Sequence, residues 1–315
     1  MYIGILGAGT MGNGIAHVFA QYNHKVILVD VNEEALKKAL NTIKSNLNRQ
    51  FQKKVIIESD VNKIMNNIIT SIDINEFKNC DLVIEAIKED LILKESIFKK
   101  LDSICKTKCI LASNTSSISI NSLADSTNRS DKVIGMHFMN PVPIMKLVEI
   151  IKGKNTSKDT LDIILNISND LNKIPIECND SPGFVSNRIL MPMINEAAYC
   201  LYEDVADASS IDTIMKLGMG HPMGPLKLAD LIGIDVCVYI LNVLFSELND
   251  VKYRPCDILV NMIENNKLGK KTGEGVFGVS FKIKGPPKDL KTIVNPVKTL
   301  TPRFITRTLE KIKKN

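Results

Sequence analysis

Gly7-Ala8-Gly9-Thr10-Met11-Gly12 is the stretch of sequence that decides the fold. It follows the apolar run Tyr2–Leu6 and opens a segment with helical periodicity, so the pattern G-x-G-x-x-G stands between a strand and a helix. The first glycine allows a tight turn, the second lets the backbone approach a pyrophosphate, and the third lets helix and strand pack closely. Free N–H groups at the start of the helix attract the phosphates. We therefore expect a dinucleotide site formed by Gly7, Gly9, Thr10, Met11 and Gly12.

Asp30 is the acidic residue that such a site requires. It ends the second strand-like run, Lys25–Val29, about 20 residues after the glycines. A carboxylate there can accept both ribose hydroxyls of NAD, and it would repel the 2′-phosphate of NADP. The prediction is NAD as the cofactor. The alternative is a glycine-rich turn that binds nothing, which the agreement of strand, turn, helix and acid disfavours.

Apolar β-branched runs alternate with helical segments through the first 180 residues. The predicted strands are Tyr2–Leu6, Lys25–Val29, Leu82–Ala86, Ile110–Ser113, Val133–His137 and Leu147–Ile151. The predicted helices are Thr10–Tyr22, Glu33–Phe51, Glu89–Ser103 and Ser157–Leu171. This alternation favours an α/β fold of Rossmann type, with a parallel sheet buried on both faces. We assign residues 1–181 to this NAD-binding domain.

After Ser181-Pro182-Gly183 the strand-like runs nearly vanish and helical periods take over. The predicted helices are Phe184–Asp204, Ile211–Leu217, Pro225–Leu248 and Pro255–Asn266. Pro192 predicts a kink or break in the first of them. Residues 182–278 should form an all-helical C-terminal domain, followed by a basic extension over 279–315. Residues 281–315 hold ten Lys or Arg against two acids, a net charge of +8.

The composition is that of an ordinary globular protein. Of 315 residues, 44% are hydrophobic and 24% are charged, which excludes disorder, collagen and coiled coil for the whole chain. Seven irregularly spaced cysteines without a Cys-x-x-Cys pair argue against a disulfide framework or a metal site, and they fit a reducing cytoplasm.

Targeting and partner signals are weak. The N-terminus has no secretory pattern. Asp230 and Asp235 interrupt the most apolar stretch, Leu228–Phe245, so we expect a buried helix and no membrane partner. A basic tail on a slightly acidic body is not typical of a nucleic-acid-binding domain.

His137 and Glu149 stand out in the region from 110 to 151. The predicted strands place His137, and the polar loop Ser113–Ser117, at the carboxyl edge of the sheet, where ligands bind in open α/β folds. A histidine there, with hydroxyls nearby and a carboxylate within reach, has the parts of a general base with an orienting partner. A histidine that ends a buried strand can equally be a satisfied core residue.

The sequence as a whole resembles the L-3-hydroxyacyl-CoA dehydrogenases, and most closely the short bacterial 3-hydroxybutyryl-CoA dehydrogenases. The matching stretches are GAGTMG, ASNTSS, HFMNPVPIMKLVEII, SPGFVSNRILMPMINEA, HPMGPLKLADLIG and GKKTGEG, in the family's order from residue 1 to about 278. The resemblance implies a dinucleotide domain followed by a helical domain that forms a homodimer. It also implies oxidoreduction of an acyl-CoA substrate with NAD.

The family's functional residues can be placed by position. His137 matches the catalytic base and Glu149 the carboxylate that holds it, while Ser116 and Asn187 match residues that contact the substrate. Imidazole can take the proton of the 3-hydroxyl near neutral pH, and hydrogen bonds to the reacting oxygen stabilise its changing charge. Beyond the glycine loop and Asp30, the cofactor residues that the resemblance implies are Glu89, Lys94, Ser116, Asn140 and Lys271. Lys53 falls near a family position that contacts CoA.

Two other hypotheses about the function remain open. The chain could act on a free hydroxy or sugar acid with the same fold, or it could be a non-catalytic relative. The stretch 141–146 resembles the CoA branch, and packing alone does not require both His137 and Glu149.

Overall fold

The computed structural model describes residues 1–277, and the basic extension predicted for 279–315 lies outside the described residues. The chain separates into two compact units. One comprises Met1–Met193 with Val236–Pro255, and the other comprises Ile194–Asp235 together with the residues that follow from Cys256. The predicted class, a Rossmann-type sheet followed by helices, is confirmed. The domain border at residue 181 stays a prediction.

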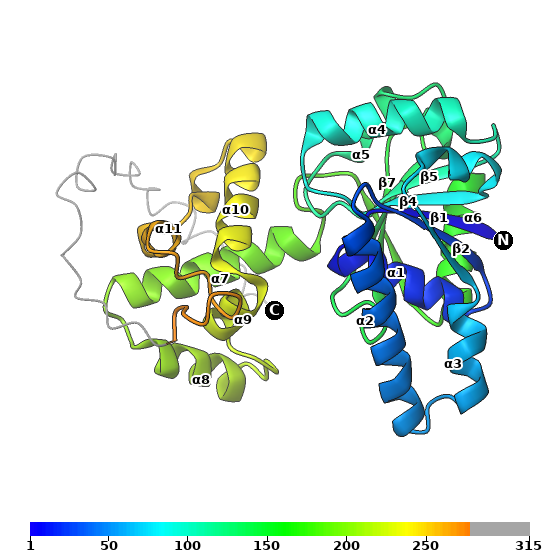
Figure 1. Cartoon of the computed structure of the whole chain (residues 1–315). Coiled ribbons are helices and arrows are strands. Elements are labelled where there is room, and N and C mark those ends of the chain that lie inside the picture. The colour runs from blue at the N-terminus through cyan, green and yellow to red at the C-terminus, as the bar shows by residue number, and fades with distance from the viewer. Residues whose placement is uncertain (278–315) are drawn as a thin grey trace, which may run out of the picture. The chain divides into compact units, whose positions relative to one another are not determined.

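The first unit is built on one eight-stranded sheet (Figure 1). Its strands are β1 (Tyr2–Leu6), β2 (Lys25–Val29), β3 (Ile68–Ser71), β4 (Leu82–Glu85), β5 (Ile110–Ser113), β6 (Val133–Phe138), β7 (Leu147–Lys152) and β8 (Ile174–Asn179). They lie in the order β3-β2-β1-β4-β5-β6-β7-β8. Neighbours are parallel except β6 and β7, which pair antiparallel. The prediction of a wholly parallel sheet is therefore wrong at one step, because the turn from β6 to β7 is too short for a crossover helix.

Two strands, β3 and β8, were not predicted from the sequence. Both are edge strands, and β3 has only four residues. On β8, Ile174 and Ile176 are exposed, so no continuous buried run marks the strand. An edge strand satisfies fewer backbone groups and buries less surface than a central one, which weakens its pattern in the sequence.

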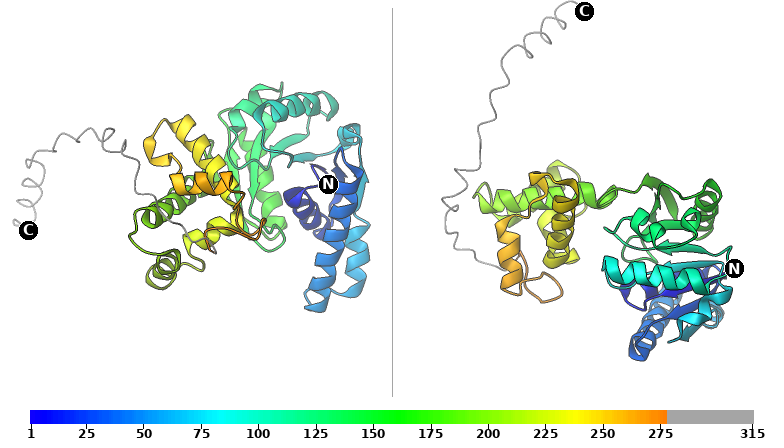
Figure 2. Two further views of the ribbon diagram at one scale, coloured as in Figure 1. Left: turned by 60° about the vertical axis from the view of Figure 1, so that its left-hand side comes forward. Right: turned by 90° about the horizontal axis from the view of Figure 1, so that it is seen from above.

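Helices cover both faces of the sheet. The helices that precede residue 186 are α1 (Thr10–Gln21), α2 (Glu33–Gln52), α3 (Glu58–Met65), α4 (Leu91–Ile104), α5 (Ile120–Asp125) and α6 (Lys158–Asp170), and the unit also contains short 3₁₀ turns at Ile74–Asn79, Ser130–Lys132 and Val251–Tyr253. Buried residues of α1, α2, α3 and α6 form one core with the sheet, and those of α4 and α5 form a second core on the opposite face. Figure 2 shows α2 and α3 side by side beyond the sheet.

The remaining helices are α7 (Ser186–Tyr202), α8 (Ala208–Gly218), α9 (Pro225–Ile232), α10 (Ile234–Leu248) and α11 (Asp257–Glu264). The helix α7 continues through Pro192, so the proline does not break it. The single helix predicted over Pro225–Leu248 is wrong, because the chain turns at Gly233, whose φ is +109°. No single helix within residues 1–277 is long and apolar enough to cross a bilayer; the broken pair α9 and α10 passes that test only on combined length and composition.

Candidate active site

The glycine loop between β1 and α1 has the geometry that its sequence predicts. Gly7 has a φ of +103°, and its N–H donates to the carbonyl of Val29 at 2.7 Å. A Cβ on Gly12 would lie 1.8 Å from the carbonyl oxygen of Gly7, so only glycine allows this close packing. A Cβ on Gly9 would meet nothing within 4 Å. The loop therefore leaves open space at the position where a pyrophosphate would approach the backbone.

The start of α1 is prepared for an anion. Gly9 is its N-cap residue and supplies no side-chain cap, and the first turn contains no acidic residue. The first backbone N–H groups of α1 and the positive end of its dipole are thus available to phosphate oxygens. These features fit the pyrophosphate of a dinucleotide.

Asp30 lies where β2 ends, directly beside the loop. Its Oδ2 accepts from the N–H of Ala8 at 2.7 Å, and its Oδ1 accepts from the N–H of Asn32 at 3.0 Å. Each carboxylate oxygen has more than one lone pair, so both can also accept a ribose hydroxyl. The two backbone contacts fix the carboxylate in position for that role.

His137 and Glu149 face one another across the antiparallel pair of strands. They are direct partners in the β6–β7 register, and Nδ1 of His137 lies 2.7 Å from Oε2 of Glu149. Both side chains are buried, and the ring of Phe184 lies 5.9 Å from the imidazole ring, centroid to centroid. Because β7 runs back along β6, the end of one strand meets the beginning of the other. This arrangement brings the Glu149 carboxylate against the His137 imidazole at the carboxyl edge of the sheet.

Glu149 is held from two directions. Besides His137, it accepts from the backbone N–H of Ser186 at Oε1, at 2.9 Å, and from the Ser186 hydroxyl at Oε2, at 2.7 Å. Burial works to raise the pKa of Glu149, but the hydrogen bonds from His137 and Ser186 outweigh it and lower the pKa. The carboxylate is therefore charged at neutral pH, and it can stabilise a protonated imidazole.

Ser116 and Asn187 meet beside this pair. Ser116 lies in the loop after β5, and the side-chain amide of Asn187, in the first turn of α7, donates to the Ser116 carbonyl at 3.0 Å. Asn114, in the same loop, accepts from the N–H of Phe138 next to His137 at 3.0 Å. The four residues predicted to be catalytic thus lie at one edge of the sheet, within one compact unit.

Glu89 and Lys94 form a buried network under the Ser116 loop. The ammonium of Lys94, 1% exposed, lies 2.9 Å from Glu85 and 2.8 Å from Glu89. Oε1 of Glu89 accepts from the Thr115 hydroxyl, from the backbone N–H of Ser116 at 3.1 Å, and from the N–H and hydroxyl of Ser117. Burial works to raise the pKa of Glu89, but the charge of Lys94 and these hydrogen bonds outweigh it and lower the pKa. Glu89 therefore fixes the loop that carries Ser116.

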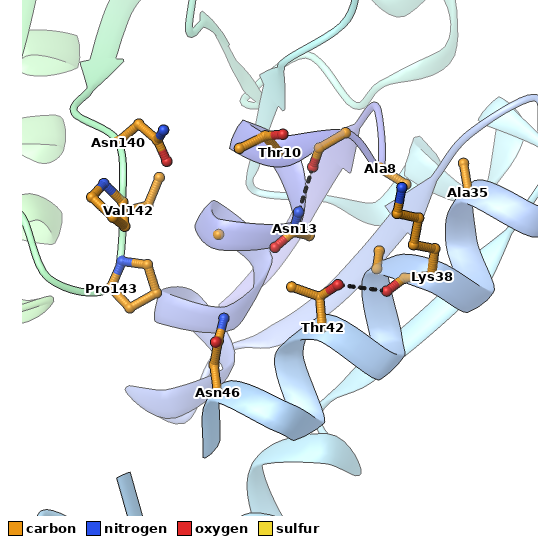
Figure 3. Close-up of a pocket in the computed structure, with 14 residues that line it drawn as sticks. Ala8, Thr10, Asn13, Ala35, Lys38, Thr42, Asn46, Asn140, Val142 and Pro143 are labelled. Carbon is orange, nitrogen blue, oxygen red and sulfur yellow. Dashed lines mark hydrogen bonds between the residues drawn. The ribbon is translucent and has the colours of Figure 1, made fainter. Parts of the chain in front are cut away.

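Two cavities flank the segment that follows β6. The first, about 410 Å³, is lined by the glycine loop, by α2 and by Asn140, Val142 and Pro143 (Figure 3). The second, about 610 Å³, has Arg49, Lys53, Lys146 and Lys173 in its wall. Both cavities are lined by Asn46, Pro141 and Pro143, so they are neighbours that share a wall. Asn140 and Lys53 lie in different cavities of this pair.

The wall between these cavities is anchored by Lys173. Its ammonium donates to the carbonyls of Val142 and Met145, at 2.5 and 2.7 Å. Burial, with the nearby charge of Lys146, lowers the pKa of Lys173 to about 8.

Lys271 belongs to the second compact unit, where its ammonium pairs with Asp235. Its predicted contact with the cofactor stays a prediction.

Some residues of the site were not found by sequence reasoning. Ser186 gave no signal beyond its place after a Pro-Gly turn, and Glu85, at the end of β4, reads as a strand terminus. Among residues 1–277, no group of three or more His, Cys, Asp or Glu side chains is arranged to hold a metal ion.

Comparison with known proteins agrees with this geometry. Residues 2–181 match the model of the 3-hydroxyacyl-CoA dehydrogenase NAD binding domain, and residues 183–278 match that of the C-terminal domain of the same family. The chain is 50% identical over 273 residues to the probable 3-hydroxybutyryl-CoA dehydrogenase of Bacillus subtilis, covering 87% of this chain and 95% of that protein. It is 46% identical over 277 residues to the 3-hydroxybutyryl-CoA dehydrogenase of Clostridioides difficile, covering 88% and 99%.

A solved structure gives the same result. The crystal structure of (S)-3-hydroxybutyryl-CoA dehydrogenase from Ralstonia eutropha superimposes with a TM-score of 0.85 at 46% identity, covering 89% of this chain and 99% of that one. The resemblance seen in the sequence motifs is thereby confirmed. The chain belongs to the family of NAD-dependent 3-hydroxyacyl-CoA dehydrogenases.

Proposed function

We propose that His137, held by Glu149, is the acid–base residue with which this chain interconverts L-3-hydroxybutyryl-CoA and acetoacetyl-CoA. The observation that carries the proposal is the buried 2.7 Å contact between the two side chains at the sheet edge that also holds the glycine loop. Packing alone would not place an imidazole against a carboxylate that also accepts two hydrogen bonds from one serine.

In the oxidation direction, His137 removes the proton of the substrate's 3-hydroxyl. Its Nδ1 faces Glu149, so Nε2 would be the nitrogen that takes the proton. Glu149 keeps the ring oriented and stabilises the imidazolium that forms, and in reduction the same ring returns the proton. Bound NAD⁺ supplies the acceptor for the hydride that leaves C3.

Ser116 and Asn187 position the reacting oxygen. The hydroxyl of Ser116 sits on a loop fixed by Glu89, and Asn187 is tied to that loop through the Ser116 carbonyl. Groups held in this way need little rearrangement when charge develops on the substrate oxygen, which is the condition for strong electrostatic stabilisation.

The second cavity supports an acyl-CoA rather than a free acid. It borders the cavity at the glycine loop and is lined by Arg49, Lys53 and Lys146. These cations suit the phosphates of the CoA nucleotide. A small free acid would leave these cations unused.

We further propose a short acyl chain, a homodimer and a cytoplasmic location. The relatives named for 3-hydroxybutyryl-CoA support a short acyl chain. Exposed apolar side chains on α8 and beyond, among them Leu217 and Met219, support a homodimer. Seven free cysteines support a reducing cytoplasm.

One assay tests the substrate directly. We expect rapid loss of the NADH absorbance band with acetoacetyl-CoA and little with free acetoacetate at equal concentration. Equal or greater turnover of the free acid would overturn the acyl-CoA assignment, and no turnover of either would overturn the short-chain reaction.

A further inference from the structure

Ser186 approaches the acid–base pair with two groups. Its backbone N–H donates to Oε1 of Glu149 at 2.9 Å, and its hydroxyl donates to Oε2 at 2.7 Å. Oε2 is also the oxygen that lies 2.7 Å from Nδ1 of His137. One carboxylate oxygen therefore has two donors, one from the histidine and one from the serine.

The backbone before α7 is shaped to bring Ser186 to this place. Gly183 and Phe184 both have positive φ, +71° and +50°. Phe184 is buried, and a bulky residue rarely adopts this conformation unless its surroundings impose it. The same turn lays the Phe184 ring beside the His137 ring and starts the helix at Glu149.

We infer that Ser186 is a positioning residue for the reaction. Its hydroxyl fixes the orientation of the Glu149 carboxylate, and by donating to Oε2 it weakens the stabilisation that this carboxylate gives to a protonated His137. The inference rests on the proposed role of the His137–Glu149 pair. The hydroxyl is placed to act through Glu149 and not on the substrate. Nothing in the reaction requires a serine at this position, whereas the pair itself requires His137 and Glu149.

The sign of the effect follows from the shared oxygen. A hydroxyl that donates to Oε2 stabilises the negative charge on its own account, so less of that charge is left to stabilise a protonated imidazole. Removing the hydroxyl should leave Glu149 a stronger partner for the imidazolium. The rate–pH curve should then move to higher pH, while a less firmly held carboxylate should lower the maximal rate.

Other titratable groups lie around the pair and have to be considered. On β8, which packs against β7, Cys178 senses the charges of Glu149, Asp180 and Glu177. Burial first, and then these carboxylates, raise the pKa of Cys178 to about 11, so its thiol is neutral between pH 6 and 9. Asp180 accepts hydrogen bonds from Ser119 and Asn121 through Oδ2.

The test compares the pH dependence of acetoacetyl-CoA reduction in full-length variants. In Ser186→Ala we expect the midpoint of the kcat curve to rise by roughly half a pH unit. The maximal kcat should fall by about three- to tenfold, with the KM for NADH unchanged. Ser186→Thr, which keeps the hydroxyl, should restore the wild-type midpoint. Ser157→Ala removes another serine at a helix start, the N-cap of α6, and should lower Tm without moving the midpoint.

Two results would overturn the inference. One is a Ser186→Ala midpoint that stays in place or moves down, and the other is a Ser186→Thr variant that behaves like Ser186→Ala. Glu149→Gln separates this from the proposed function. If Glu149→Gln loses activity while Ser186→Ala keeps the wild-type curve, only the role of Ser186 fails. If Glu149→Gln retains full activity, the acid–base assignment itself fails.

Discussion

The glycine loop and the His137–Glu149 pair occupy the same edge of one sheet but are built in opposite ways. The loop uses backbone groups: a turn at Gly7, free N–H groups at the start of α1, and an open position at Gly9. The pair uses buried side chains from β6 and β7, held by a serine from α7. The loop binds through backbone groups that border an open position, whereas the pair acts through side chains that are buried in the protein.

This difference separates binding from chemistry. A site made of backbone groups depends little on the surrounding side chains, and it contributes to cofactor affinity. A site made of buried side chains depends on every partner that fixes its geometry and charge, and its contribution is to rate. Mutations in the two regions should therefore change different measured quantities.

The largest effect is expected from Glu149→Gln. Glutamine keeps the shape but loses the charge, and its amide would place an N–H group among donors from His137 and Ser186. We expect kcat to fall by about 10²–10⁴-fold, with NADH affinity within twofold of wild type. Steady-state kinetics and NADH fluorescence titration measure the two quantities, and a parallel loss of both would contradict the separation.

Alanine substitutions at Gly12 and Gly9 should have two different effects on the loop. Gly12→Ala forces a Cβ against the Gly7 carbonyl, so it should cost about 1–3 kcal/mol of stability and weaken NADH binding by tenfold or more. Gly9→Ala meets nothing in the protein. It should keep the wild-type Tm while it weakens NADH binding, because the methyl group occupies the approach of the pyrophosphate. Thermal melts with and without NADH separate the cases; a Gly9→Ala protein with normal affinity would refute the proposed phosphate position.

Asp30→Ala should weaken NADH binding by about tenfold and should not weaken NADPH binding, since it removes both ribose contacts and a repulsion. The variant also removes the acceptor of the Ala8 N–H. Asp30→Asn is the matched control, because it keeps an acceptor and loses the charge. Titration of all three proteins with both cofactors gives the answer, and a wild-type preference for NADPH would show that Asp30 has another role.

The smallest effect is expected from Lys53→Ala. Lys53 is exposed at the end of α2, so loss of the proposed contact with a CoA phosphate should change KM for acetoacetyl-CoA by only about two- to fivefold. The change should shrink at high salt and vanish with a pantetheine thioester that lacks the nucleotide. Lys44→Ala, an exposed lysine of the same helix outside both cavities, is the control. Equal effects of the two variants would mean that only net charge matters.

The same contrast explains what the sequence could predict. The glycine loop and Asp30 lie within 24 residues, and their positions directly after the first two strands were predicted correctly. His137 and Glu149 were identified, but the reason that they touch was not. Their contact depends on β7 running antiparallel to β6, and alternation of apolar residues carries no information on strand direction.

Contacts between distant residues were the hardest to foresee. Ser186 reaches Glu149 across 37 positions, and Glu89 reaches the Ser116 loop across 27. The first contact depends on a turn whose unusual backbone angles no propensity predicts, with Phe184 at φ +50°. The edge strands β3 and β8 were missed because their faces are half exposed.

One variant tests the central claim, that binding and chemistry reside in separate regions. His137→Ala should bind NADH with wild-type affinity, because the glycine loop and Asp30 are untouched. Its kcat with acetoacetyl-CoA should fall by about 10²–10⁴-fold, or roughly 3–5 kcal/mol of barrier. NADH titration and turnover measured on the same preparation decide it. Near-normal kcat, or a loss of NADH affinity as large as the loss of rate, would contradict the account.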